Sequence, residues 1–297
     1  MKLLIITQKV DIADSNLGFF HSWIAEFAKY CEQVTVICLQ EGAHNLPANV
    51  IVKSLGKERG TNKLTQILTF AFCTLNSSYD AVLVHMNPEY LVLAGWYWRL
   101  LGKRVALWYT HKHVDLKLKI AEKFANIIFT ASAGSFRLKS KKVVVTGHGI
   151  DTDHFSPDPS VPREKFALTV GRISPAKHIQ EIIDSTPAQY ELVIAGAPIT
   201  KQDYEYKEHL TGKATFLGPV LYKNLPDLYR RASLFVNMST TGSIDKAVLE
   251  ALACDTPVKT TNEAFLNMPE TDRREWVIEN HSLKRLIPKI VERLKNC

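Results

Sequence analysis

Short runs of aliphatic and β-branched residues alternate with longer amphipathic stretches in the first half of the chain. Apolar runs of this length indicate strands that are buried on both faces, as in a parallel sheet. The predicted strands are Lys2–Thr7, Val34–Leu39, Ala81–His85, Val105–Tyr109, Ile127–Ala131 and Lys142–Thr146. The stretches that predict helices between them are Phe19–Tyr30, Leu64–Leu75 and Leu91–Leu101. This alternation predicts an open parallel sheet with helices on both faces.

A segment rich in aspartate and proline, from Gly149 to Pro162, interrupts the alternation and suits a hinge. The alternation then resumes, with predicted strands at Phe166–Val170, Glu191–Ala195, Thr215–Leu217, Leu234–Asn237 and Pro257–Thr260. The predicted helices are Ala176–Asp184, Leu225–Ala232, Ile244–Ala253 and an amphipathic last helix, Leu283–Asn296. We therefore predict an α/β protein with two Rossmann-like domains, residues 1–150 and 151–297, that face each other across a cleft. The last helix is the element that would cross back to the first domain.

Composition narrows the class of protein. Of the 297 residues, 46% are hydrophobic and 23% are charged, which is average for a globular domain and excludes disorder, collagen-like repeats and coiled-coil rods. No apolar run reaches the roughly 18 residues that cross a bilayer. The apolar run Leu3–Ile6 is shorter than the signal-peptide core of at least about 7 residues. We expect a cytoplasmic protein. The five cysteines form no CxxC pair, which argues against a zinc site or a disulfide framework.

Charge is distributed unevenly along the chain. Residues 1–150 contain 18 lysines and arginines against 10 acidic residues, a net charge of +8, whereas the rest contains 19 against 20. The excess is concentrated between Lys103 and Lys142. This segment either is a solvated surface that keeps the protein in solution or attracts an anionic membrane, a phosphate-bearing substrate or nucleic acid. We expect no nucleic-acid partner, because the segment lacks the stacking aromatic residues of a single-strand groove.

One stretch of the second half has the residues of an anion site. A predicted strand ends at Gly171, and the next predicted helix begins with Pro175 in its first turn. Arg172 and Lys177 flank that helix start, where free backbone N–H groups and the helix dipole attract anions. Arginine binds phosphate through two N–H groups and lysine supplies a point charge, so this pair would clamp a diphosphate. The alternative is two solvated charges in an ordinary loop.

A second stretch, residues 239–258, leads from a predicted strand through small residues into a helix. Thr241 or Ser243 would cap this helix, and Gly242 would let the backbone approach a ligand closely. Glu250 follows two turns later. Its alternative role is an exposed ion pair with Lys246, one helical turn before it.

Together the two stretches resemble the donor domain of the GT-B glycosyltransferases, specifically glycosyltransferase family 4. The family's Gly-Arg…Lys element is matched by Gly171, Arg172 and Lys177, and the end of its Glu-x7-Glu element with the following Ala-Met-Ala-Cys-Gly-Thr-Pro-Val is matched by residues 250–258. Further matches are Gly149-Ile150-Asp151 with Phe155, Ile194-Ala195-Gly196, and Leu217-Gly218-Pro219-Val220 leading to Leu225-Pro226 and Tyr229. The resemblance covers nearly the whole chain and is more specific in the second half.

The resemblance implies a GT-B fold and a retaining, metal-independent transferase, with a nucleotide-sugar as substrate and no cofactor. Arg172 and Lys177 would act as catalytic residues that stabilise the departing diphosphate, and Glu250 would bind the ribose hydroxyls. Backbone N–H groups of the small-residue turn would bind the phosphates or the sugar. The first Glu of the family's element falls on Gly242, so Asp245 either supplies a carboxylate instead or only favours the helix dipole. The donor-binding residues so implied are Arg172, Lys177, Thr241, Gly242, Ser243, Asp245 and Glu250.

The first domain has weaker candidates for the acceptor side. His111 follows the predicted strand Val105–Tyr109, and the resemblance implies a histidine near the reacting centre at about this place; His113 is the second choice. Asp11 and Asp14 would bind acceptor hydroxyls or simply cap a turn. The acceptor-side candidates are Gly18, Asp11, Asp14, His85, His113 and His148.

The resemblance therefore predicts a hexosyltransferase that moves a sugar from a UDP- or GDP-sugar to the hydroxyl of a sugar or lipid-linked acceptor, in the synthesis of a cell-surface glycan or glycolipid. Its place would be the cytoplasm, either free or peripherally on the inner membrane face through Lys103–Lys142. Two alternatives stay open. One is another GT-B enzyme, a nucleotide-sugar epimerase or hydrolase, and the other is a non-catalytic nucleotide-sugar-binding protein, which Gly242 in place of a glutamate suggests.

Overall fold

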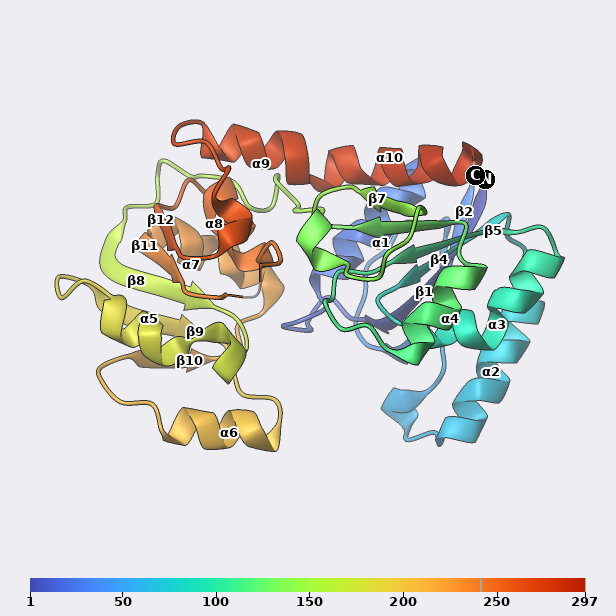
Figure 1. The fold of residues 1–297 in the computed structure, drawn as a ribbon, viewed down its shortest axis with the longest axis horizontal. Coiled ribbons are helices and arrows are strands. Elements are labelled where there is room, and N and C mark those ends of the chain that lie inside the picture. Colours follow the sequence, from blue (N-terminus) through green and yellow to red (C-terminus); the bar gives the residue numbers. More distant parts are fainter. Residues whose placement is uncertain (241, 297) are drawn as a thin grey trace. The chain divides into compact units, whose positions relative to one another are not determined.

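Two parallel sheets organise the chain in the computed structural model, which describes residues 1–240 and 242–296 (Figure 1). The contacts between residues divide the chain into two units. Unit 1 comprises Met1–Gly149 together with Leu283–Cys297, and unit 2 comprises Ile150–Ser282. Each unit contains one sheet with helices on both of its faces.

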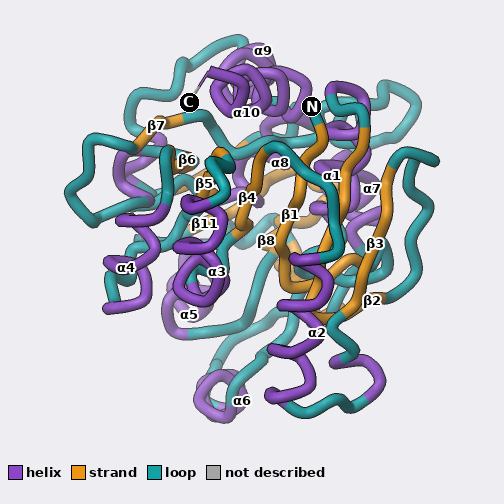
Figure 2. The backbone as a smooth tube through the Cα atoms, turned by 90° about the vertical axis from the view of Figure 1, so that its right-hand side faces the viewer, coloured by secondary structure: helices purple, strands orange, loops and turns teal. Residues whose placement is uncertain are grey.

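The sheet of unit 1 has seven parallel strands in the order β3-β2-β1-β4-β5-β6-β7 (Figure 2). They are β1 (Lys2–Val10), β2 (Gln33–Glu41), β3 (Val50–Ser54), β4 (Ala81–His85), β5 (Arg104–Trp108), β6 (Ile127–Thr130) and β7 (Val143–Val145). In the centre, Ile5 of β1 is paired with Val36 of β2 and Leu83 of β4. The predicted run of buried strands therefore forms one continuous sheet, which β3 extends at its edge.

The helices of unit 1 cover both faces of this sheet. They are α1 (Phe19–Tyr30), α2 (Lys63–Leu75), α3 (Glu89–Leu100), α4 (Leu116–Phe124) and α10 (Leu283–Asn296). Successive side chains of a strand point to opposite faces, so Leu3 and Ile5 pack in one core cluster with α1 and α10. Leu4 and Ile6 pack in the other cluster with α2, α3 and α4. Among the described residues, no helix has both the length and the apolarity that a membrane-crossing segment requires.

The sheet of unit 2 has five parallel strands in the order β10-β9-β8-β11-β12. They are β8 (Glu164–Val170), β9 (Glu191–Ala195), β10 (Thr215–Gly218), β11 (Ala232–Asn237) and β12 (Val258–Thr260). The helices are α5 (Ile179–Ser185), α6 (Lys201–Glu208), α7 (Leu225–Arg231), α8 (Lys246–Ala253) and α9 (Arg273–His281). One face of the sheet packs with α5 and α6, whereas α7 and α8 contact β11.

The predicted helix Ala176–Asp184 is wrong in one respect. A single 3-10 turn, Pro175–Lys177, is separated from α5 by His178, whose backbone is left-handed with φ 51°. Because this conformation ends a right-handed helix, Pro175 begins only an isolated turn. The anion site expected there has no continuous helix behind it.

Candidate functional site

The strand order of unit 2 brings the two stretches that were predicted to bind the donor to the same end of the sheet, at the carboxyl ends of its strands. From β8 the chain continues to β9 and β10 on one side, whereas β11 and β12 lie on the other side of β8. The loops that follow β8 and β11 therefore diverge. Open parallel sheets bind ligands outside the carboxyl ends of their strands at such a switch point. The stretch from Gly171 to Lys177 follows β8, and the stretch from Ser239 to Asp245 follows β11.

An ion pair joins these two loops. The Nζ atom of Lys177 lies 2.5 Å from Oδ2 of Asp245, which also accepts a hydrogen bond of 3.0 Å from Asn237 at the end of β11. Burial alone would raise the pKa of the Asp245 carboxyl, but Lys177 and Asn237 outweigh burial and lower that pKa. An ammonium group has three N–H donors, and Asp245 accepts from one of them. The carboxylate thus fixes the position of a cation at the switch point.

Arg172 is fixed by a second carboxylate. Its Nε donates to Oδ2 of Asp203 over 2.7 Å, and its side chain remains 42% exposed. The same carboxylate accepts from the backbone N–H groups of Ile199 and Thr200, as part of the capping box that begins α6. Burial opposes ionisation of Asp203, but these N–H groups and Arg172 lower its pKa to about 2. The guanidinium is therefore held at the loops that follow β8 and β9, with part of its surface open to solvent.

Two glycines let these loops pack directly on each other. The backbone N–H of Gly171 donates to Ala195 O over 3.0 Å. Gly196 has φ 154°, and a Cβ atom there would lie 1.8 Å from Gly171 O. Any side chain at position 196 would thus push the loop of Arg172 and Lys177 out of place.

The loop after β11 is held by its neighbours. Gly242 has a left-handed φ of 60°, and the carbonyl of Ser243 accepts a hydrogen bond of 2.8 Å from the buried Asn262. The N-cap of α8 is Asp245, so the predicted cap at Ser243 is wrong. Asp245 lies closer to the helix and occupies that position. Thr241, the other predicted cap and donor ligand, lies outside the described residues.

Glu250 lies in the layer of α7 and α8 and is only 4% exposed. Its Oε2 accepts a hydrogen bond of 2.9 Å from the Tyr229 hydroxyl, and its Oε1 lies 3.1 Å from Nζ of Lys246. The alternative role of Glu250, an ion pair with Lys246, is thus confirmed for the partner. The pair was expected to be exposed, but Glu250 is buried. Burial lowers the pKa of Lys246, although the attraction of Glu250 opposes this effect. These contacts do not connect Glu250 to Arg172 or Lys177.

In unit 1 the switch point lies between β1 and β4. His85 ends β4; its Nδ1 lies 3.3 Å from the Thr7 hydroxyl, and its ring stacks on Phe20 with a centroid distance of 3.9 Å. The rings of His85 and His148 lie 6.4 Å and 6.1 Å from Trp108 at the end of β5. The structure therefore gathers these two candidates around one buried aromatic cluster.

His111 and His113 follow β5 and are both exposed. The backbone N–H of His113 donates to Nδ1 of His111 over 3.1 Å, so the neutral His111 ring carries its proton on Nε2. In the loop after β1, Oδ1 of Asp14 accepts from two backbone N–H groups and its Oδ2 pairs with Lys9. Asp11 contacts the same lysine.

The last two observations concern the acceptor-side candidate Gly18 and metal binding. Gly18 is the N-cap of α1. Within the part of the chain that the structure describes, no three His, Cys, Asp or Glu side chains gather closely enough to hold a metal ion.

Two functional partners escaped the sequence reasoning. Asp203 positions Arg172, and Asn237 donates to Asp245, the carboxylate that holds Lys177. Only Asp203 has a local signal in the sequence, the capping-box spacing from Thr200.

Two Rossmann-like parallel sheets in series define the class of the protein as GT-B-like. Residues 164–296 match the family model described as glycosyl transferases group 1. The second half of the chain is therefore similar to this family, as the resemblance to glycosyltransferase family 4 predicts.

Two curated proteins and a solved structure are also similar to this chain. A D-inositol 3-phosphate glycosyltransferase from Mycobacteroides abscessus is 27% identical over 156 residues, 46% of this chain and 35% of that protein. A mannosylfructose-phosphate synthase from Agrobacterium fabrum is 28% identical over 153 residues, 42% of this chain and 34% of that protein. The matches thus span about a third of the length of these curated relatives. The crystal structure of Anabaena HepE in complex with UDP covers 100% of both chains at a TM-score of 0.73 and 18% identity, which shows a shared fold.

Proposed function

We propose that the chain is a retaining, metal-independent glycosyltransferase that moves a hexose from a UDP- or GDP-sugar to an acceptor hydroxyl. The observation that carries this proposal is the pair of cations at the switch point of unit 2, each positioned by a largely buried carboxylate. A cation that is already fixed in place stabilises a developing negative charge without reorganising during the reaction.

In the proposed reaction, the bond between the anomeric carbon of the sugar and the diphosphate oxygen breaks. The acceptor oxygen forms a new bond to that carbon on the same face, and the proton of its hydroxyl passes to the leaving diphosphate. Negative charge then accumulates on the leaving diphosphate. Lys177 and Arg172 donate N–H groups to its oxygens, and the backbone of Gly242 and Ser243 approaches the same groups. For His111 of unit 1, with His113 as its alternative, we propose a role in the transfer step.

For Glu250 we propose the ribose hydroxyls as ligands. A carboxylate has about four lone-pair sites, and Tyr229 and Lys246 use two of them in this structure. Asp245 is paired with Lys177, so we propose that its role in donor binding is to position that lysine.

We propose that unit 1 takes the acceptor, a sugar or a lipid-linked sugar, in the synthesis of a cell-surface glycan or glycolipid. The solvent-exposed lysines and arginines between Lys103 and Lys142 would hold the protein peripherally at an anionic membrane on its cytoplasmic side. The acceptor-side candidates His85, His148, Asp11, Asp14 and Gly18 all lie in this unit.

A thermal-shift screen with UDP, GDP, ADP and their sugars tests the donor proposal, because a ligand of the native state raises the melting temperature. We expect a rise with UDP or GDP and their sugars. No rise with any nucleotide would refute a donor site. Release of free sugar at full rate without acceptor would favour a hydrolase, and nucleotide binding without turnover on any acceptor would favour a binding protein.

A further inference from the structure

Helix α2 is apolar on two faces. Phe70 and Cys73 face the core of unit 1. On the opposite side Leu64, Leu68 and Phe72 follow one another at intervals of four residues, and each is more than 60% exposed. A helix with apolar residues all round is normally buried. The outer side of α2 therefore lacks the cover that its composition requires.

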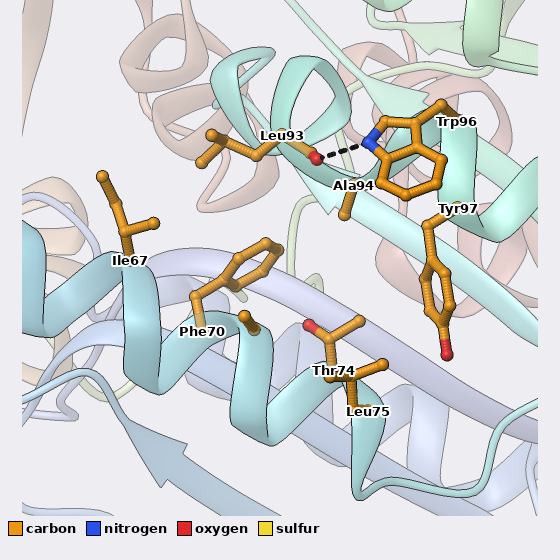
Figure 3. A pocket seen from close by; sticks show the side chains of 9 residues that line it. Ile67, Phe70, Thr74, Leu75, Leu93, Ala94, Trp96 and Tyr97 are labelled. Carbon is orange, nitrogen blue, oxygen red and sulfur yellow. Dashed lines mark hydrogen bonds between the residues drawn. The ribbon is translucent and has the colours of Figure 1, made fainter.

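Helix α3 continues this surface. Leu93, Trp96 and Leu100 recur at helical spacing and are 43%, 52% and 77% exposed. Figure 3 shows the side chains of α2 and α3 on the two sides of a groove of about 270 Å³. Its lining includes Ile67, Phe70, Leu75, Leu93, Trp96 and Tyr97. We call the exposed apolar rows of both helices, together with this groove, the α2–α3 face. A continuous exposed apolar surface that spans two helices indicates an interaction site.

The charge beside this face indicates its partner. Helix α2 has one lysine, Lys63, and no acidic residue, and α3 has the exposed Arg99 in its last turn and Glu89 at its opposite end. Helix α4 packs on α3 and carries three exposed lysines. They are Lys117, Lys119 and Lys123. A second copy of the chain would bring like charges together, whereas an anionic bilayer complements both the apolar rows and the cations.

We propose that the α2–α3 face inserts into the interface of an anionic bilayer while the lysines of α4 contact the lipid headgroups. Trp96 suits this depth, since tryptophan is enriched at membrane interfaces. The inference rests on the membrane contact in the proposed function and deepens it: the basic segment attracts the bilayer, and the α2–α3 face anchors the protein in it.

Co-sedimentation with vesicles of phosphatidylcholine, with and without phosphatidylglycerol, tests the proposal. The variant Leu68→Gln/Phe72→Gln changes two exposed side chains, so its circular dichroism spectrum should match the parent. We expect its partition into phosphatidylglycerol vesicles to fall by about tenfold, because binding scales with the apolar area inserted. The matched control is Leu266→Gln in unit 2, where an equally apolar side chain is 79% exposed; this variant should partition like the parent.

A charge variant separates this inference from the proposed function. Lys117→Glu/Lys119→Glu should also weaken binding, and added salt should weaken the binding of the parent. If only the charge variant loses binding and Leu68→Gln/Phe72→Gln binds like the parent, the anchor is refuted and the electrostatic membrane contact survives. If the parent binds no vesicle and instead sediments as a dimer that Leu68→Gln/Phe72→Gln dissociates, the face is a self-interface and the proposal fails. UDP binding, measured by calorimetry on the same variants, reports on the donor site independently.

Discussion

Replacing Lys246 by methionine should destabilise unit 2 strongly, because it removes the cation that balances a buried carboxylate. Glu250 is 4% exposed, and among the described residues the side chain that still binds it without Lys246 is Tyr229, through its hydroxyl. Breaking a buried ion pair by removing one partner costs about 3–5 kcal/mol. The Lys246 side chain is 20% exposed and the tyrosine bond persists, so we expect the lower end, about 3 kcal/mol.

Urea denaturation at neutral pH measures this loss as a lower transition midpoint with an unchanged slope. The control is Lys246→Met/Glu250→Gln, which removes both charges and keeps an acceptor for Tyr229. It should recover most of the stability. If Lys246→Met is as stable as the parent within about 0.5 kcal/mol, the buried pair does not have the energetic role assigned to it.

Three further predictions concern other parts of the chain. Burial lowers the pKa of His281 from 6.5 to about 4. The contribution of the neutral ring to the free energy of unfolding is therefore complete above pH 6.5 and is lost as the pH falls through 4. His281→Gln should therefore remove about 3 kcal/mol of the stability difference between pH 7 and pH 4, and an unchanged acid profile would contradict this. Gly196→Ala should lower the free energy of unfolding by more than about 2 kcal/mol and weaken UDP binding, because its Cβ would meet Gly171 O. A variant as stable as the parent would show that the two loops can move apart without loss of stability. His111→Ala should reduce turnover more than UDP affinity in a coupled assay, and full turnover would transfer the role to His113 or His148.

Much of the fold could be predicted because buried parallel strands and amphipathic helices leave clear patterns. The helix Phe19–Tyr30 and the strands Ala81–His85 and Glu191–Ala195 have the predicted bounds. Helix α6 was not predicted, because its sequence KQDYEYKE has only one buried residue, Asp203, and hence no apolar stripe. The edge strand β3 is only half-buried and gives an equally weak pattern.

The candidate site could be placed from the sequence, but its internal contacts could not. Arg172 and Lys177 were expected at the end of a strand, and both lie there. Their carboxylate partners are 31 and 68 residues away along the chain, at Asp203 and Asp245. Such pairs depend on strand order, which sets which loops become neighbours. The left-handed backbone of His178 has no local signal either, and its ring lies 3.1 Å from the hydroxyl of Thr240, 62 residues away along the chain.

The fixed cation at the switch point is tested most directly by titrating UDP and GDP into the parent, Lys177→Met and Lys177→Met/Asp245→Asn in a calorimeter. The double variant leaves no unpaired carboxylate and retains an oxygen for Asn237, so it separates folding from binding. A hydrogen bond to a charged group contributes about 1.5–3 kcal/mol. Both variants should therefore bind the better nucleotide about tenfold or more weakly than the parent. Equal affinity in folded Lys177→Met/Asp245→Asn would contradict the assignment of Lys177 to the diphosphate.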